Sequence, residues 1–476
     1  MFEEFDNSDI CALATPQGTS AIAVIRTTGP ECLSKLDRIF VPKGQTGALA
    51  STMGYRMRFG LIMDADVVVD EVLVAIFRAP HSYTGEESAE IYCHGSNYVI
   101  GKIMETLLSN GFRMAQPGEF SKRAFLNGKM DLAQTEAVAD LISSETAAAH
   151  NLAIKQMRGG FSKELKEMRQ EMLNLLSLME LELDFSEEEV EFADRARLRE
   201  LLDSATQRCR SLCNSFRAGN AIRNGVPVAI AGAPNSGKST LLNALLHDDR
   251  AIVSPIPGTT RDTIEEGCVL GGILMRFIDT AGLRESDDCI ERMGIERSRA
   301  KIREAFVVLG VLDAAIDPDE LLAQACELAS CMSSEDQKLV LLLNKLDIAD
   351  NPHANKNVMR ANTFVSLLED KGINAIVLEI SAKTGLGLEK LLDTLASCCS
   401  PDSGSDLLVT NARHAEALRA SAEALDKVAS GLELQLPTDL LAEDLRDAIS
   451  HLGTITGEIS TDEVLGEIFG RFCIGK

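Results

Sequence analysis

One segment of the chain has the residue types and spacing that hold phosphate groups. It reads GAPNSGKS, spans 232–239, and stands after an apolar strand and before the helical segment STLLNALL. In such a loop, backbone N–H groups and the N-terminus of the helix bind phosphate oxygens. We expect Lys238 to reach the β and γ phosphates and the Ser239 hydroxyl to bind magnesium. The segment therefore predicts a nucleoside triphosphate site.

Three further motifs follow in the order that a guanine nucleotide site requires. DTAG at 279–282 ends a strand, so that the Asp279 carboxylate can lie near magnesium. NKLD at 344–347 also follows a strand, and the Asp347 carboxylate can accept both N–H groups of a guanine edge. Adenine presents a lone pair at that ring nitrogen, so such a site discriminates on the order of 10⁴-fold. With SAK at 381–383 as the last base-contacting loop, the motifs predict GTP rather than ATP.

Hydrolysis needs a group that orients or polarises the attacking water. Small signalling GTPases have a glutamine directly after DTAG, whereas this chain has Leu283, which neither donates nor accepts a hydrogen bond. Asn235 and the segment SPIPGTTRD at 254–262 offer neutral oxygens that suit a large monovalent cation, which could offset developing negative charge. Glu291 is a candidate for positioning the water, although its spacing also fits a solvated acid at a helix end.

The predicted nucleotide site takes its residues from all of these motifs. Lys238 and Glu291 are the expected catalytic residues. The residues expected to bind GTP are Asn235, Ser236, Gly237, Lys238, Ser239, Thr240, Ser254, Pro255, Ile256, Pro257, Gly258, Thr259, Thr260, Asp279, Thr280, Ala281, Gly282, Asn344, Lys345, Leu346, Asp347, Ser381, Ala382 and Lys383.

These motifs need a scaffold that brings them together, and the hydrophobic pattern predicts one. From about 225 to 400, apolar strands alternate with helical segments, which is typical of a mostly parallel sheet covered on both faces. Before it, short β-rich runs and the helical segment NYVIGKIMETLLSNG indicate an α+β domain, and the segments on either side of 225–400 show helical spacing. We expect the two helical pieces to form one discontinuous domain with the nucleotide domain inserted. The predicted domains are 1–127 (α+β), 128–223 (helical, first part), 224–400 (GTPase) and 401–476 (helical, second part).

Composition limits the classes of function. The chain of 476 residues is too long for one core, and its formal charge of -25 argues against a broad surface for polyanions. It lacks the roughly 18 uninterrupted apolar residues of a membrane helix, and its N-terminus is acidic where a signal peptide is basic, so we expect a cytoplasmic protein without membrane contact. The 12 cysteines form no CxxC pair and are expected to be reduced. Only Cys473 is kept as a possible site residue.

Taken together, the motifs resemble one family, the tRNA uridine-modifying GTPases called MnmE or TrmE. GAPNSGKST, PGTTRD, DTAGLRE and IERMGIERS are similar to its GTPase domain, and ribosome-assembly GTPases share much of that pattern. Three segments outside that domain are more specific. SYTGEESAEIYCHG (82–95), PGEFSKRAFLNGKMDLAQTEAVADLI (117–142) and the terminal FCIGK (472–476) look like the folate-binding, helical and C-terminal signatures of the family.

The resemblance implies partners and cofactors. The family forms a homodimer through its N-terminal domains and a heterotetramer with a flavoprotein of the MnmG or GidA type, which uses FAD and NADH. The complex binds tRNA and adds an aminomethyl or carboxymethylaminomethyl group to C5 of the wobble uridine. The added carbon comes from a tetrahydrofolate derivative, 5-formyl or methylene, and GTP hydrolysis with potassium and magnesium drives a conformational change.

Residue roles carry over motif by motif. Asn235, Ser254, Ile256 and Thr259 would hold potassium, Ser239 and Thr260 would hold magnesium, and Glu291 would assist hydrolysis. Arg26, Glu90, Lys129 and Lys476 would contact the folate, whose anionic tail suits cations and whose pterin edge suits a carboxylate.

The sequence departs from the family at three places and leaves one alternative open. Ala233 stands at a variable position of the phosphate loop, Thr19 and Ser20 replace a Gly-rich stretch near the folate residues, and Ser254 replaces a threonine. Only the change at Thr19 and Ser20 puts folate affinity in question. The alternative function is an assembly or signalling GTPase whose N-terminal domain docks a partner, and the GTPase motifs alone do not separate the two.

Overall fold

The computed structural model describes residues 7–44, 47–184, 195–246, 252–254, 265–270, 272–279, 299–332, 337–349, 359–399, 407–470, 472 and 475. The chain forms two compact units. The first contains Met1–Ile142, Ile154–Thr206 and Ala420–Lys476, and the second contains Ser143–Ala153 and Gln207–Arg419. The domain boundaries expected after residues 127, 223 and 400 remain predictions. Among the helices that the structure describes, we find no apolar stretch of the length that a membrane span requires.

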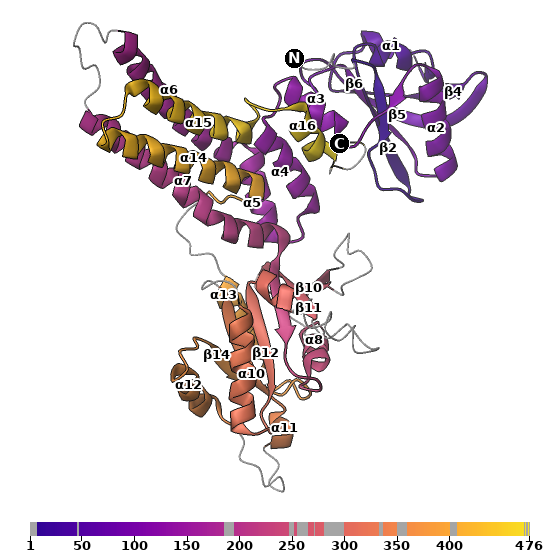
Figure 1. Ribbon diagram of the computed structural model, residues 1–476. Coiled ribbons are helices and arrows are strands. Elements are labelled where there is room, and N and C mark those ends of the chain that lie inside the picture. The colour runs from indigo at the N-terminus through magenta and orange to yellow at the C-terminus, as the bar shows by residue number, and fades with distance from the viewer. Residues whose placement is uncertain are drawn as a thin grey trace, which may run out of the picture. The chain divides into compact units, whose positions relative to one another are not determined.

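The N-terminal part of the first unit is a seven-stranded, largely antiparallel sheet in the order β3-β4-β5-β6-β2-β1-β7. Helix α2 (Asn97–Ser109) packs its buried side on this sheet and ends before Gly111, whose φ is +88° (Figure 1). The small helix α1 spans Cys32–Leu36. The strands are β1 (Ile10–Leu13), β2 (Ile22–Thr28), β3 (Phe40–Pro42), β4 (Arg56–Asp64), β5 (Val67–Phe77), β6 (Ser88–His94) and β7 (Arg113–Met114).

The helical part confirms the expected discontinuous helical fold. Helix α6 (Gly160–Asp184) packs along α15 (Thr438–Thr456), although the two are far apart in sequence. An Arg446–Glu180 ion pair of 2.6 Å joins them, because both helices expose charged side chains beside their shared apolar seam. The other helices are α3 (Glu119–Leu126), α4 (Leu132–Ser143), α5 (Ala147–Met157), α7 (Arg195–Asn224), α14 (Ala412–Glu433) and α16 (Asp462–Gly470).

The second unit contains a seven-stranded sheet in the order β14-β13-β12-β8-β11-β10-β9. It is parallel from β14 to β11, and β10 pairs antiparallel with both of its neighbours. The strands are β8 (Val226–Ala231), β9 (Ile252–Ser254), β10 (Glu265–Leu270), β11 (Ile273–Asp279), β12 (Val307–Asp313), β13 (Lys338–Asn344) and β14 (Ile376–Glu379). The central strands are apolar on both faces, as a doubly covered parallel sheet requires.

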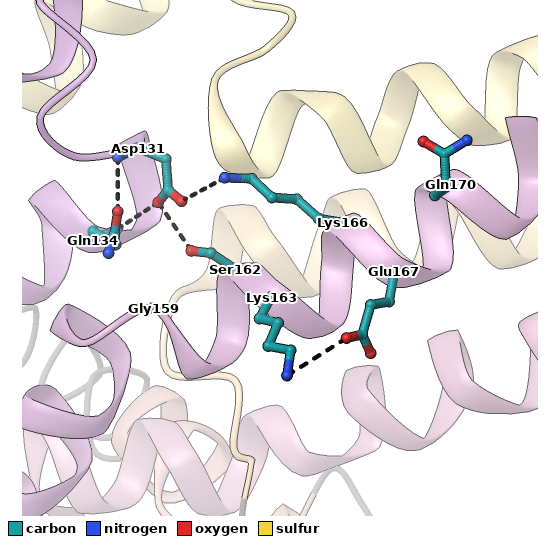
Figure 2. A pocket seen from close by; sticks show the side chains of 8 residues that line it. All are labelled: Asp131, Gln134, Gly159, Ser162, Lys163, Lys166, Glu167 and Gln170. Carbon is teal, nitrogen blue, oxygen red and sulfur yellow. Dashed lines mark hydrogen bonds and ion pairs between the residues drawn. The ribbon is translucent and has the colours of Figure 1, made fainter.

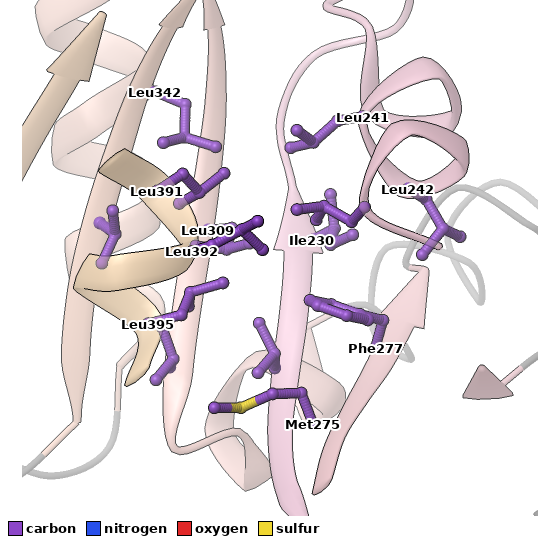
Figure 3. Close-up of a cluster of buried hydrophobic side chains, with 14 of the residues drawn as sticks. Ile230, Leu241, Leu242, Met275, Phe277, Leu309, Leu342, Leu391, Leu392 and Leu395 are labelled. Atoms are coloured by element: carbon purple, nitrogen blue, oxygen red, sulfur yellow. The ribbon is translucent and has the colours of Figure 1, made fainter. Parts of the chain in front are cut away.

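Separate hydrophobic cores lie on the two faces of this sheet, which confirms the predicted architecture. Figure 3 shows leucines of α8 (Lys238–Leu246) and α13 (Leu388–Cys399) against side chains of β8, β11, β12 and β13. The other core is formed with α10 (Pro318–Cys331) and α12 (Ala361–Glu369). The short helix α11 (Leu346–Ala349) follows β13 directly.

The C-terminal helix α16 is held against the rest of the first unit by a small cluster of leucine and phenylalanine side chains. Phe469 is buried with Leu132 and Leu465, and its ring lies 6.4 Å from that of Phe125. Gly118, at the start of α3, lies directly against the Phe469 carbonyl. The position of the chain end therefore depends on a close backbone approach between α3 and α16.

Replacing Gly118 by Ala is expected to destabilise the first unit. Gly118 has a φ of +67°, and a Cβ atom there would lie 2.5 Å from the carbonyl oxygen of Phe469. The left-handed backbone costs an alanine roughly 1 kcal/mol, and the clash must also displace α16. Chemical unfolding followed by circular dichroism measures the change in the free energy of unfolding.

Gly128→Ala is the matched control, because Gly128 has the same φ of +67° but a Cβ atom there would meet nothing within 4 Å. Its free energy of unfolding should fall only by the backbone cost of roughly 1 kcal/mol. Equal losses in the two variants would show that the approach to Phe469 contributes nothing to stability.

Candidate functional site

The phosphate loop joins β8 to α8, and its glycines stand where no side chain fits. A Cβ atom on Gly232 would lie 2.2 Å from the carbonyl oxygen of Val311, and one on Gly237 would lie 2.3 Å from Nδ2 of Asn344. Both glycines also have positive φ angles, +150° and +105°. The loop is thus pressed against the ends of β12 and β13, which leaves its N–H groups to line a phosphate site.

Lys238 folds back over this loop. Its Nζ donates to the carbonyl oxygens of Gly232 and Ala233 at 2.9 and 2.8 Å, and only 8% of the residue is exposed. The ammonium is therefore held within the loop, where a phosphate would meet it. Ser239 and Thr240 follow in the first turn of α8 and are exposed.

Ser236 is buried beside the loop, with 2% of its surface exposed. Within the described residues its Oγ has no hydrogen-bond partner. Leaving a buried hydroxyl unsatisfied costs about 1–3 kcal/mol, so a bound nucleotide group or water that reaches this oxygen would be favoured.

Asn344 connects the phosphate loop to the last base-contacting loop. Its Nδ2 donates to the carbonyl oxygen of Ser236 at 2.8 Å, and its Oδ1 accepts from the Ala382 N–H at 3.0 Å. Since both ends of the amide are engaged, Asn344 supports the shape of the site from behind. NKLD and SAK, separate in sequence, are brought together as the sequence analysis expects.

Asp347 is oriented by a neighbour from the other loop. The Ser381 Oγ donates to Asp347 Oδ1 at 2.7 Å. Ser381 itself is fixed by a backbone bridge to Leu386. The Asp347 carboxylate therefore has a defined direction, as a base-reading group needs. Leu346 lies buried at the start of α11, and Lys383 is exposed.

Asp313 is a residue of this site that the sequence analysis missed. Its Oδ2 lies 2.7 Å from Nζ of Lys345 in the NKLD motif. A signal was available: Asp313 is the acid that ends the apolar strand FVVLGVLD, and polar residues at the carboxyl ends of parallel strands tend to meet.

Several predicted residues lie outside the described residues. For Ser254 and Asp279 the structure describes the backbone, at the ends of β9 and β11. The predicted residues outside the described ranges are Pro255, Ile256, Pro257, Gly258, Thr259, Thr260, Thr280, Ala281, Gly282, Glu291, Cys473 and Lys476, together with Leu283.

In the first unit, Arg26 and Glu90 form an ion pair. They face each other across β2 and β6, and Nε and Nη2 of Arg26 lie 3.0 and 2.8 Å from Glu90 Oε1. Tyr92 donates to Glu90 Oε2 at 3.0 Å. Desolvation raises the pKa of Tyr92 above its usual range, and the hydrogen bond to Glu90 adds to this rise.

Aromatic rings and the chain end surround Arg26. The guanidinium carbon lies 5.5 Å from the centre of the Tyr83 ring and 5.8 Å from that of Phe120. Its Nη1 donates to the carbonyl oxygen of Gly475 at 3.3 Å, across 449 positions of sequence. The structure therefore brings the C-terminal motif to Arg26. Lys129 donates instead to the carbonyl oxygen of Pro80, at 2.9 Å.

Comparison with known proteins decides the family. Residues 9–129 match the family described as the N-terminus of the GTP-binding protein TrmE. Residues 132–473 match the family described as the MnmE helical domain. The chain belongs to the MnmE family. The tRNA modification GTPase MnmE of Bacteroides fragilis is 48% identical over 470 residues, which are 98% of this chain and 99% of that protein. The protein of the same name from Bacteroides thetaiotaomicron is 49% identical over 473 residues, with the same two coverages.

Among solved structures, the G domain of the T. maritima FeoB iron transporter is 27% identical. The match covers 37% of this chain and 99% of that chain, with a TM-score of 0.26. The agreement with the two MnmE proteins extends over nearly the full length of the chain, including the segments on both sides of the GTPase motifs.

A cavity of about 380 Å³ in this MnmE-family chain is lined by none of the predicted site residues. It is lined by residues of α4, α6 and the turn before α6, and its charges pair internally: Lys166 lies 3.6 Å from Asp131, and Lys163 lies 3.8 Å from Glu167 (Figure 2). Asp131 also accepts from Ser162. The two lysines and two acids give the lining no net formal charge.

We expect Asp347→Asn to weaken GTP binding and to relax selectivity toward xanthosine nucleotides. The asparagine loses two charge-assisted hydrogen bonds to guanine, which corresponds to roughly a hundredfold loss of affinity. Its amide can instead donate to the oxygen that xanthine presents in place of the guanine amino group. Titration of fluorescent guanosine and xanthosine nucleotides measures both effects.

Asp370→Asn, at the exposed end of α12, controls for the loss of one negative charge from the same unit. It should bind both nucleotides as the wild type does. If Asp347→Asn kept the full affinity for GTP, the base would bind elsewhere.

Proposed function

We propose that this chain hydrolyses GTP and, with a flavoprotein of the MnmG or GidA type, adds an aminomethyl or carboxymethylaminomethyl group to C5 of the wobble uridine of certain tRNAs. The carbon would come from a 5-formyl or methylene tetrahydrofolate, and FAD and NADH would be bound by the partner. One observation carries the proposal beyond GTP hydrolysis. The hydrogen bond from Arg26 to Gly475 joins the N-terminal domain to the C-terminal FCIGK motif, the two segments that distinguish this family from other GTPases.

The residues around Arg26 fit a folate in chemical type. Glu90 is a carboxylate that can accept the N–H groups of a pterin edge, and its Oε1 lies 2.8 Å from Nη2 of Arg26 in an ion pair. Tyr83 and Tyr92, both partly exposed, offer aromatic surface against which a flat ring can pack. Lys129 and Lys476 would meet the anionic tail; of these, only Lys129 lies within the described residues. The bound folate would supply the one-carbon unit, while these side chains bind and orient it.

An exposed apolar sheet face supports a homodimer. Met57 and Phe59 on β4 are 52% and 45% exposed, and Leu73 on β5, which is 42% exposed, lies opposite Phe59. Leu73 in turn lies opposite Tyr92 on β6, so this apolar surface shares one face of the sheet with Glu90. Contiguous exposed apolar surface marks an interaction site, and we assign this face to a second copy of the chain. The folate site would then lie next to the dimer interface.

Potassium and magnesium would act at the phosphate loop. Asn235 is exposed in the loop with a φ of +62°, so its side-chain oxygen is available to a cation, and Ser239 presents a hydroxyl at the start of α8. Ser254, Ile256 and Thr259 would complete the potassium site, and Thr260 the magnesium site. A bound potassium ion would offset the charge that develops during hydrolysis, and Glu291 would position the water.

We expect GTP hydrolysis to be faster in potassium chloride than in sodium chloride at equal concentration. Leu283 cannot orient water, and the smaller sodium ion should fit poorly in a cage of neutral oxygens. Equal turnover in the two salts would refute the role of the cation.

The Asn235→Ala variant should lose most of this stimulation and still bind nucleotide. An alanine is strained at a φ of +62°, whereas a glycine is not, so Asn235→Gly removes the same oxygen without the strain. Both variants should therefore lose potassium stimulation alike. If only the alanine variant lost it, the backbone and not the oxygen would be responsible.

The C-terminal segment is expected to support folate binding and to leave the GTPase intact. Gly475 has a φ of +94°, and a Cβ atom there would lie 2.5 Å from the carbonyl oxygen of Leu13. Gly475→Ala should displace the segment and break the hydrogen bond between Arg26 and the carbonyl oxygen of residue 475. The loss of this bond corresponds to roughly tenfold weaker binding of 5-formyltetrahydrofolate, which calorimetry measures. Deletion of residues 473–476 should weaken it at least as much and abolish the modified nucleoside.

Gly470→Ala is the control, because a Cβ atom on Gly470 meets nothing within 4 Å. Potassium-stimulated GTP hydrolysis should be unchanged in all three proteins. Equal folate affinity with normal levels of the modified nucleoside in the deletion variant would show that the tail has no part in this chemistry.

A further inference from the structure

The backbone at Lys345 adopts a conformation that a side chain of its kind seldom takes. Its φ is +67°, in the left-handed region, where a residue with a Cβ atom is disfavoured. Lys345 stands between Asn344, whose amide joins two loops of the nucleotide site, and Leu346, where α11 begins. A residue held in a disfavoured backbone conformation needs surrounding contacts that keep it there.

The side chain of Lys345 is contacted by Asp313, in addition to the backbone hydrogen bonds from Ile348 N–H to the Lys345 carbonyl and from Leu346 N–H to the Ile380 carbonyl. Oδ2 of Asp313 lies 2.7 Å from Nζ of Lys345, and the two side chains are 23% and 29% exposed. Oδ1 of the same carboxylate accepts from the Ala315 N–H at 3.0 Å, which fixes its orientation. The carboxylate is therefore anchored at one oxygen and binds the lysine with the other.

The sheet places Asp313 for this contact. Asp313 ends β12 and lies in register with Asn344, which ends the neighbouring parallel strand β13. The Ala314 N–H donates to the Asn344 carbonyl at 3.0 Å, so the chain after β12 stays joined to the NKLD motif beyond the last paired residues. The loop after β12 is thus part of the support of the base-contacting loop.

We propose that Asp313 is a positioning residue for guanine recognition, which rests on the proposed GTP site. By holding the Lys345 ammonium, Asp313 keeps residue 345 in its left-handed conformation. The turn at residue 345 sets the direction in which α11 starts, and α11 carries Asp347. Asp313 therefore controls how well the Asp347 carboxylate meets both N–H groups of guanine, although it does not itself touch the base.

The test compares the affinities for GDP and IDP, because the hypoxanthine base of IDP lacks the amino group that guanine offers to Asp347. The wild type should bind GDP more tightly than IDP, and Asp347→Asn should lose that preference. The comparison of these two proteins tests the proposed GTP site itself. Asp313→Asn retains Oδ1 for the Ala315 N–H and removes the charge that holds Lys345. It should reduce the preference for GDP over IDP by up to about fivefold, the upper end of the range for a partly exposed ion pair.

Two further variants separate positioning from general stability. Asp317→Asn alters another carboxylate of the same loop, one that accepts the Asp319 N–H at the start of α10 without contacting Lys345. It should leave the preference for GDP unchanged even where it lowers thermal stability. Lys345→Met should lower the preference, and adding Asp313→Asn to it should cause no further loss.

The outcomes are distinct. If Asp313→Asn weakened GDP and IDP by the same factor, or if its effect simply added to that of Lys345→Met, Asp313 would have no positioning role. If Asp313→Asn did not fold, an unchanged preference for GDP in Lys345→Met would overturn the inference equally. A wild type without any preference for GDP would instead overturn the proposed GTP site.

Discussion

The side-chain amide of Asn344 joins the predicted phosphate loop to the predicted base-contacting loop, and the arrangement of the candidate nucleotide site depends on this junction. It donates to the carbonyl oxygen of Ser236 and accepts from the Ala382 N–H, and Asn344 is 2% exposed. A buried polar group that loses its partner costs about 1–3 kcal/mol, so both bonds are strongly retained. An amide supplies a donor and an acceptor on one short side chain, which a carboxylate does not. Phosphate recognition and base recognition are thereby kept at one fixed spacing.

The parallel sheet makes this junction possible. Strands β8, β12 and β13 are neighbours, and each delivers its following loop to the same edge. The chain runs from β8 to strands on one side of the sheet and later to strands on the other, so β8 lies at the point where the strand order reverses. Ligands of open α/β sheets bind at such points because the loops on either side diverge and leave a crevice. The tight approach of Gly232 and Gly237 to the ends of β12 and β13 follows from the same geometry.

In the first unit, distant segments are brought together by antiparallel strand register and helix packing. Arg26 and Glu90 meet because they lie opposite each other on adjacent antiparallel strands, so their pairing is set by register. The chain end reaches Arg26 because α16 is fixed against α3 by Phe469 and its aromatic neighbours. The helical part thus acts as the connection between the C-terminal motif and the sheet. In both units a short polar contact joins segments that are far apart in the chain.

The sequence by itself determined the kind of each element and the chemistry of the nucleotide motifs. The apolar strands, the phosphate loop and the amphipathic helices were predictable because each depends on residues that are close together in the chain, where side-chain period and glycine spacing carry the information. The family followed from the same local motifs. The tertiary structure alone decided which side chains pair: Asp313 with Lys345, Tyr92 with Glu90, and Arg26 with the Gly475 carbonyl. Periodicity indicates the face on which a residue lies but not the partner opposite to it, because that partner is set by strand order, register and the packing of distant helices.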